Sequence, residues 1–333
     1  MTNPDPAPPV SWPIDLAHVQ AARERIRPYL VPTALRSYPA LDEVLGGGIH
    51  VLVKHENHNP TNSFKVRNAF SALTALGEED QRRGVVAGTR GNHGQGLAYA
   101  GWVLGVDVTI CVPRGNVAHK NFAIRSYGAE LVEVGDDYDD AVEAAERLGR
   151  ERDLVVVHST NNPFVLAGAG TIALEAVQQD PSFDTVVVAV GGGSQAVGTL
   201  AVLRGLGQKT EVYGVQSEGA RAVYESWRAG RPVAMPEARS FADGIATRNA
   251  YEMTLPALCQ GLAGFVTVSD AEIAEALRVL IATTHNLVEG AGAAGLAGLL
   301  KMRDKLRGRR CVVILSGANI EMVTLERVLS REL

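Results

Sequence analysis

The sequence predicts an α/β protein with mostly parallel, twisted sheets that are covered by helices. Three observations support this fold class. Short apolar runs rich in Val, Ile and Leu show little polar alternation, as in strands that are buried on both faces. Longer segments with helical periodicity separate most of these runs, and such alternation favours parallel sheets. Glycine is in excess, at 35 of 333 residues, so many tight turns and close backbone approaches are expected.

Nine apolar runs are predicted to be strands. In chain order they are Val51–Lys54, Val85–Gly88, Val106–Val112, Glu130–Val134, Leu154–His158, Thr185–Val190, Glu211–Gln216, Gly264–Val268 and Cys311–Leu315. These strands could form one sheet, or two sheets that face a cleft. Periodicity does not decide between the two arrangements.

Seven longer segments are predicted to be helices. They are His93–Leu104, Ala118–Tyr127, Asp139–Arg150, Pro163–Gln178, Gln195–Leu206, Asp270–Thr284 and Ala291–Leu306. The helix that begins at Asp270 has the clearest start signal, because Ser269 and Glu272 form a capping box. Its apolar residues, which include Ile273 and Leu277, then lie on one side.

A further helix is expected to begin near Lys65. The apolar residues Val66, Ala69, Phe70, Leu73 and Leu76 have the spacing of one helix face. Ser63 is placed to be its N-cap. Lys65 would lie in the first turn, where the helix dipole and partial burial both lower the pKa of its amine. Such an amine is a nucleophile that can form a Schiff base, although an ordinary surface lysine remains the alternative on position alone.

The composition excludes several classes of protein. Apolar residues make up 46% and charged residues 21% of the chain, which is typical of a soluble globular protein. The net charge is -5 without a basic stripe, so we expect no nucleic-acid partner. No apolar run approaches 18 residues and Met1–Val10 lacks a signal pattern, so a cytoplasmic protein without a membrane span is predicted.

Three polar, glycine-rich segments follow predicted strands, where parallel sheets bind their ligands. They are Thr89–Gly96, Gly191–Ser194 and Ser316–Asn319. In the second segment, three glycines let the backbone approach an anion closely, and the helix that follows offers free N–H groups. This pattern predicts a phosphate cradle. It is not a nucleoside-triphosphate loop, because no Gly-Lys-Ser/Thr follows.

Other interpretations of the glycine-rich segment stay open at this point. Gly191, Gly193 and Ala196 weakly match a dinucleotide fingerprint, and Glu218 lies near the end of the next strand. A nicotinamide or flavin enzyme is therefore a competing hypothesis, and a simple packing turn is another. The run His55–His58 has the wrong spacing for a helical zinc site.

Considered together, four segments resemble one family. They are Asn59–Lys65, Gly91–Gln95, Gly191–Ser194 and Ser316–Asn319. They occur in the order found in pyridoxal-phosphate enzymes of the tryptophan-synthase-β fold type. Within that group the chain is most similar to the serine/threonine dehydratases (ammonia-lyases) and their serine racemase relatives. The likeness runs from about Ile14 to about Glu326. It implies a large cofactor-binding domain from residues 1–83 and 162–333, with a small domain, 84–161, inserted in it.

The resemblance also implies a role for each site residue. Lys65 would hold pyridoxal 5'-phosphate as a Schiff base, and Ser316 would contact the pyridine nitrogen. Phe64 and the Gly244 backbone would pack on the two ring faces, and Asn92 would donate to the ring hydroxyl oxygen. The phosphate would be bound by Gly191, Gly192, Gly193 and Ser194. The substrate carboxylate would be bound by Thr89, Arg90, Gly91, Asn92 and His93.

The implied reaction is the β-elimination of a small 3-hydroxy amino acid, such as threonine, serine or a 3-substituted serine, to a 2-oxo acid and ammonia. Lys65 would be the general base for the α-proton. A hydroxyl at Ser316 makes the ring a weaker electron sink than a carboxylate would, which favours elimination over transamination. β-Replacement and racemisation are the alternatives within the fold, with a nicotinamide-dependent dehydrogenase further away. Relatives are commonly homodimers.

The chain departs from the family pattern at several positions. Arg90 stands where racemising relatives place an acid/base serine, and a guanidinium does not take up a proton, so we expect elimination without appreciable racemisation. Arg90 also suits an acidic substrate such as 3-hydroxyaspartate, or it braces the loop or the cofactor phosphate. Gln216 and Ala222 replace the acids of a divalent-metal site, so no such site is expected; a monovalent cation stays open.

Overall fold

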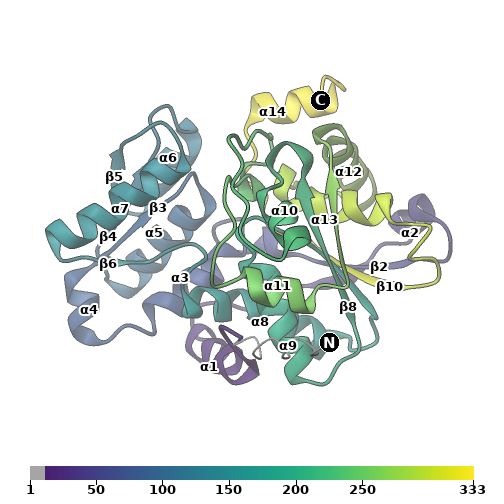
Figure 1. The fold of residues 1–333 in the computed structure, drawn as a ribbon, viewed down its shortest axis with the longest axis horizontal. Helices are drawn as coiled ribbons and strands as arrows, with labels where there is room; N and C mark the ends of the chain where they lie inside the picture. The colour runs from purple at the N-terminus through teal and green to yellow at the C-terminus, as the bar shows by residue number, and fades with distance from the viewer. Residues whose placement is uncertain (1–11) are drawn as a thin grey trace, which may run out of the picture.

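The protein builds two separate sheets, each flanked by helices (Figure 1). We describe a computed structural model, which covers residues 12–333. A six-stranded sheet has the order β1-β2-β10-β7-β8-β9, and a four-stranded sheet has the order β5-β4-β3-β6. The strands are β1 (Leu35–Ser37), β2 (His50–Lys54), β3 (Val85–Gly88), β4 (Val108–Val112), β5 (Glu130–Glu133), β6 (Val155–Val156), β7 (Thr185–Ala189), β8 (Glu211–Ser217), β9 (Gly264–Val268) and β10 (Arg310–Ile314).

The prediction of parallel sheets is confirmed. Among the described residues, β1 pairs antiparallel with β2, and all the other strand pairs are parallel. All nine predicted strands are present: Val85–Gly88 and Gly264–Val268 have the predicted bounds and the others have shifted ends, the largest change being the shortening of 154–158 to β6. Strand β1 was missed, because three residues at a sheet edge leave no periodic signal. The structure also decides for two sheets over one, which periodicity left open.

The helices alternate with the strands along most of the chain. They are α1 (Leu16–Ile26), α2 (Pro39–Leu45), α3 (Lys65–Leu73), α4 (Glu78–Arg83), α5 (Asn92–Leu104), α6 (Ala118–Ser126), α7 (Tyr138–Arg152), α8 (Pro163–Gln179), α9 (Ser194–Gly205), α10 (Ala222–Ala229), α11 (Leu255–Gly261), α12 (Asp270–Thr284), α13 (Gly290–Lys301) and α14 (Met322–Leu329). The capping box of Ser269 and Glu272 is confirmed at the start of α12. Of the helices that were not predicted, α4 buries no side chain, so it carries no amphipathic pattern.

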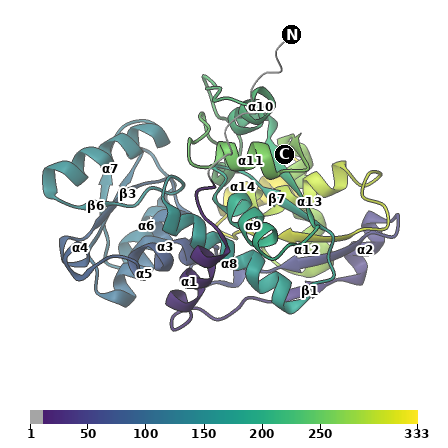
Figure 2. The same cartoon turned by 60° about the horizontal axis from the view of Figure 1, so that its bottom comes forward.

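Both faces of the six-stranded sheet are covered. One apolar core lies between this sheet and α12 and α13, and a second lies between the sheet and α8 and α9. This double coverage explains why the strands read as apolar runs without alternation. The four-stranded sheet and its helices α5–α7 lie beside the larger sheet in both views (Figure 2). Within residues 12–333, no helix is long and apolar enough to span a membrane.

The start of α3 differs from the prediction that Ser63 caps it. The helix begins at Lys65, and the N-cap position is Phe64, which has helical backbone angles and no side-chain cap. Ser63 instead forms a bridge with Gly317, and the Phe64 N–H donates to the Ser316 carbonyl at 3.0 Å. The Ser63 Oγ still accepts from the Lys65 N–H at 3.4 Å, but Ser63 lies one position before the N-cap and pairs with the segment after β10.

A buried ionic network holds the other side of α3. The Arg67 guanidinium donates to both carboxylate oxygens of Glu56, at 2.6 and 3.0 Å, and to both of Glu175, at 2.7 and 2.8 Å. Lys54 donates to Glu175 at 2.8 Å and to the Thr33 carbonyl at 2.7 Å. All these side chains are buried. Since Arg67 lies two positions after Lys65, the network fixes the helix that carries Lys65.

We expect Arg67→Met to lower the free energy of unfolding by about 3–5 kcal/mol, because two carboxylates would stay buried with only Lys54 as counter-charge. Urea unfolding measures this. Arg125→Met is the matched control, since Arg125 forms an exposed pair with Glu133 and should cost less than about 1 kcal/mol. Equal losses in the two variants would show that the buried network does not stabilise α3.

Candidate active site

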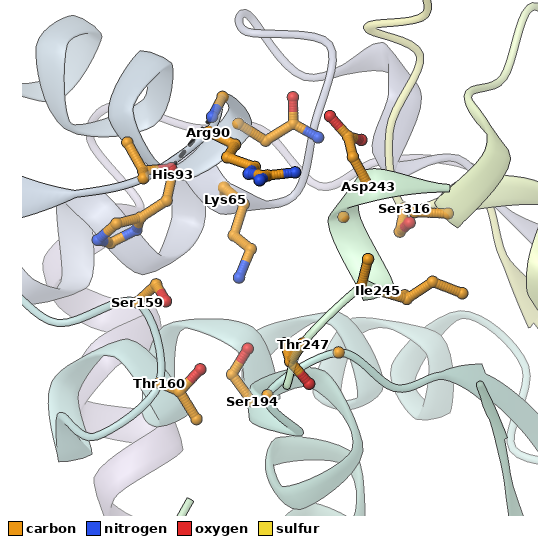
Figure 3. A pocket seen from close by; sticks show the side chains of 18 of the residues that line it. Lys65, Arg90, His93, Ser159, Thr160, Ser194, Asp243, Ile245, Thr247 and Ser316 are labelled. Carbon is orange, nitrogen blue, oxygen red and sulfur yellow. Dashed lines mark hydrogen bonds between the residues drawn. The ribbon is translucent and has the colours of Figure 1, made fainter. Parts of the chain in front are cut away.

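A pocket lies where the carboxyl ends of strands from both sheets meet (Figure 3). The loops after β3, β7 and β10 all reach it. Each residue that the sequence assigned to the site lines this pocket: Phe64, Lys65, Thr89, Arg90, Gly91, Asn92, His93, Gly191, Gly192, Gly193, Ser194, Gly244 and Ser316. The structure thus gathers these side chains in one place, while the role of each residue stays a prediction.

Lys65 is the first residue of α3, and its amine points into the middle of the pocket (Figure 3). Burial lowers the pKa of this amine to about 8, against the opposing charge of Glu289. The Lys65 Nζ lies 5.0 Å from the centre of the Phe64 ring. A buried amine with this pKa has a substantial neutral fraction near physiological pH, so it can act as a nucleophile or a base.

The segment from Gly191 to Ser194 forms an anion cradle. Gly193 has a φ of 99°, which favours glycine, and α9 follows directly. A Cβ on Gly192 would lie 2.1 Å from the Thr160 Oγ1, so the backbone needs glycine there. Thr254 donates to the Gly192 carbonyl at 2.7 Å and holds the loop. The N–H groups in the first turn of α9 have no partner within the helix and are available to an anion.

Asn92 lies in a chain of hydrogen bonds across the pocket wall. Its Nδ2 donates to Glu289 at 2.6 Å, and its Oδ1 accepts from Asn319 at 2.7 Å. One N–H of the amide is left for a ligand. Burial raises the pKa of Glu289 to about 7, with Lys120 acting in the opposite direction. The Asn92 amide is therefore fixed in orientation before any ligand binds.

His93 is held by the protein itself. Its Nε2 lies 3.0 Å from the Val157 carbonyl and donates to it, and burial lowers the pKa of the imidazole to about 3. The ring is neutral at any physiological pH and ties the loop after β3 to the neighbouring strand region. This geometry favours the loop-brace interpretation of the side chain, and a contact with substrate stays a prediction.

Several pocket residues were missed as site residues: Lys120, Tyr138, Ser159, Thr160, Asp243, Thr247, Tyr251 and Glu289. Lys120, on α6, forms an ion pair with Asp243, and Tyr138 and Ser159 share a hydrogen bond of 2.9 Å. Of these, Asp243 adjoins Gly244, which the sequence assigned to the site, so it could have been found. The others have no local sequence signal. Residues 12–333 contain no cluster of three potential metal ligands.

Comparisons with known proteins agree with this geometry. The family model described as pyridoxal-phosphate dependent enzyme matches residues 26–317. The chain is 35% identical to L-threonine ammonia-lyase of Thermotoga maritima over 320 residues, which cover 96% of this chain and 79% of that protein. It is 34% identical to L-threo-3-hydroxyaspartate ammonia-lyase of Pseudomonas sp over 305 residues, or 90% and 94% of the two chains.

Among solved structures, the crystal structure of a threonine deaminase from T.th. is similar to the chain with a TM-score of 0.87 and 35% identity, covering 93% of this chain and 99% of the other. The predicted resemblance is confirmed by the family model, the relatives and this structure. The chain belongs to the family of pyridoxal-phosphate dependent enzymes.

Proposed function

We propose that the protein catalyses the β-elimination of a small 3-hydroxy amino acid, such as threonine or serine, to a 2-oxo acid and ammonia. The observation that carries this proposal is the buried Lys65 amine, which faces the same pocket as the glycine-rich anion cradle. Relatives that are named threonine and 3-hydroxyaspartate ammonia-lyases support the reaction class.

The residues present fit pyridoxal 5'-phosphate. The cofactor needs an amine for its aldehyde, a site for its phosphate and a surface for its ring. Lys65 supplies the amine, and the cradle that a Cβ on Gly192 would obstruct supplies N–H donors for the phosphate. The buried ring of Phe64 lines the pocket between them. When bound, the cofactor withdraws electrons from the α-carbon of an attached amino acid.

We further propose the following contacts with the cofactor. Lys65 holds it covalently through Nζ, and the backbone from Gly191 to Ser194 binds its phosphate. The free Nδ2–H of Asn92 donates to the ring hydroxyl oxygen. Ser316, after β10, meets the ring nitrogen through its hydroxyl. Phe64 and the backbone of Gly244 enclose the two ring faces.

In the reaction, the chain's own residues bind the substrate and move its protons. The substrate carboxylate is bound by the loop from Thr89 to His93, where the N–H groups in the first turn of α5 are free. The Lys65 amine would take the proton from the α-carbon. Burial lowers the pKa of this amine to about 8, closer to neutral pH than that of an exposed lysine, which suits a general base.

Elimination is favoured over racemisation by the position of Arg90. Racemisation needs a second group that exchanges a proton on the opposite face of the α-carbon. A guanidinium does not accept a proton, so Arg90 does not act as that base. The proposal therefore expects recovered serine to keep its stereochemistry while 2-oxo acid is formed.

A release assay for 2-oxo acid on the holoenzyme tests the function. The panel contains threonine, serine, 3-phenylserine and both diastereomers of 3-hydroxyaspartate, each with and without added sulfide. We expect 2-oxo acid and equimolar ammonia from at least one of these substrates. A yellow holoenzyme that turns over none of them, or that yields product only with sulfide, would contradict the β-elimination proposal.

We also propose, from the family resemblance, that the enzyme is a cytoplasmic homodimer and that residues 84–161 form a small domain inserted in the larger one. The separate sheets support the domain division, since strands β3 to β6 lie within 84–161. Sedimentation velocity of the holoenzyme tests the dimer.

A further inference from the structure

Arg90 places an unpaired guanidinium in the pocket. It lies in the turn between β3 and α5, and its side chain points inward above Lys65 (Figure 3). Its Nε is buried and has no hydrogen-bond partner within residues 12–333. A cation that is partly removed from water without a counter-ion is unfavourable, and a bound anion would relieve this cost. The side chain therefore does not brace its own loop, which was one interpretation of the sequence.

Among the described residues, Arg90 forms no ion pair with the acidic side chains that line the pocket. Besides Arg90, the charged residues that line it are Lys65, Lys120, Asp243 and Glu289. Asp243 pairs with Lys120, and Glu289 accepts from Asn92. Burial also raises the pKa of Glu289 to about 7, which reduces its negative charge near neutral pH. Glu289 Oε2 has no hydrogen-bond partner among the described residues, yet neither pocket carboxylate forms an ion pair with Arg90.

Neither the phosphate nor the α-carboxylate requires Arg90. The glycine cradle and its helix provide the phosphate site, and Figure 3 shows Ser194 on the side of the pocket opposite Arg90. The first backbone hydrogen bond of α5 is donated by the Gln95 N–H to the Gly91 carbonyl, at 3.0 Å. The N–H groups of the preceding turn are thus free for the α-carboxylate. The unpaired guanidinium of Arg90 therefore suggests that the substrate carries an anionic group in addition to its α-carboxylate.

We propose that the substrate carries a carboxylate on its side chain, which Arg90 binds, so that the preferred substrate class is 3-hydroxy dicarboxylic amino acids, with 3-hydroxyaspartate as the smallest member. This inference rests on the proposed β-elimination and narrows its substrate. A planar guanidinium matches a carboxylate through two parallel hydrogen bonds, which gives selectivity as well as affinity.

The reaction balances without a further reactant. The α-carbon loses its proton to Lys65, and the C3–O bond breaks with the electron pair leaving on oxygen. The leaving hydroxide takes up one proton, which balances the proton removed from the α-carbon, and departs as water. The resulting enamine takes up one water and releases ammonia. One molecule of 3-hydroxyaspartate thus gives one oxaloacetate and one ammonia. The side-chain carboxylate is unchanged throughout, so Arg90 acts in substrate selection and positioning.

The test compares kcat/KM for 3-hydroxyaspartate and threonine in the wild-type holoenzyme and in Arg90→Ala and Arg90→Gln. We expect the wild type to prefer 3-hydroxyaspartate, and each variant to lower the ratio of the two kcat/KM values by about 10- to 150-fold, the range for a charge-assisted pair. Arg90→Gln keeps most of the side-chain length, and its kcat/KM ratio decides the test if Arg90→Ala does not fold. Arg114→Ala is the matched control, because Arg114 lies in the adjoining pocket and pairs with Asp136 at 2.8 Å. It should leave the ratio unchanged.

A binding measurement gives a second readout. Succinate and butanoate lack the amine, so neither attaches to the cofactor, and they differ by one carboxylate. Calorimetric titration of the wild-type holoenzyme should show succinate binding at least about tenfold more tightly than butanoate, and Arg90→Gln should remove the difference.

The outcomes separate this inference from the proposed function. Turnover of threonine or serine without turnover of 3-hydroxyaspartate would overturn the inference and leave the β-elimination intact. Equal losses for all substrates in both Arg90 variants would also overturn it, because Arg90 would then serve the shared α-carboxylate. If the holoenzyme turned over none of the substrates in the panel, the proposed function itself would be contradicted.

Discussion

Replacing Lys65 with alanine is expected to lower kcat by about 10³-fold or more, because the pocket loses both its covalent anchor and its general base. Lys65 lies at the first position of α3, and burial lowers the pKa of its amine to about 8. The measurement is 2-oxo acid release, together with the visible absorbance of the bound cofactor. Borohydride reduction followed by peptide mapping of the wild type should place a pyridoxyl adduct on Lys65.

Two control variants accompany this prediction. Lys65→Arg keeps a positive charge but has no amine that can form a Schiff base, so it should be as inactive as Lys65→Ala. Lys209→Ala removes an exposed lysine outside the pocket and should keep full activity. A borohydride adduct that maps to another lysine, or full turnover by Lys65→Ala, would reject the assignment of Lys65.

The second large effect is expected at the anion cradle. A methyl group at Gly192 would lie 2.1 Å from the Thr160 Oγ1 and 3.0 Å from two Thr160 carbons, and Thr160 is buried. Gly192→Ala must therefore displace either the loop or Thr160, which costs about 1–3 kcal/mol. We expect the affinity for pyridoxal 5'-phosphate to fall about 5- to 150-fold, as measured by absorbance titration of the cofactor-free protein.

The contact with Thr160 also provides a rescue. The double variant Gly192→Ala/Thr160→Gly restores the space and should recover part of the lost affinity. Gly77→Ala is the glycine control, because a Cβ there would meet nothing within 4 Å. Cofactor binding by Gly192→Ala that equals binding by Gly77→Ala would show that the loop yields without cost, and the cradle would then not depend on glycine at this position.

Much of the fold was predictable because its signals are local. The capping box before α12 and the apolar face that follows are read directly from neighbouring residues, and the structure has this helix at the predicted bounds. Strand β1 and helix α4 were missed, because the first is very short and the second buries nothing. Ser63 was wrongly expected to cap α3, because its pairing with Gly317 joins segments that only tertiary folding brings together.

Lys65 as the candidate nucleophile, the glycine-rich loops and the alternation of strands and helices were all predictable without the structure. These features depend on residue type and on spacing along one short segment. Only the tertiary structure decided that the strands form two sheets, that Thr160 and Glu289 complete the pocket, and that Arg90 has no partner among the described residues that line it. Strand pairing, side-chain burial and the lack of a counter-ion depend on contacts between distant parts of the chain, so no local sequence pattern predicts them.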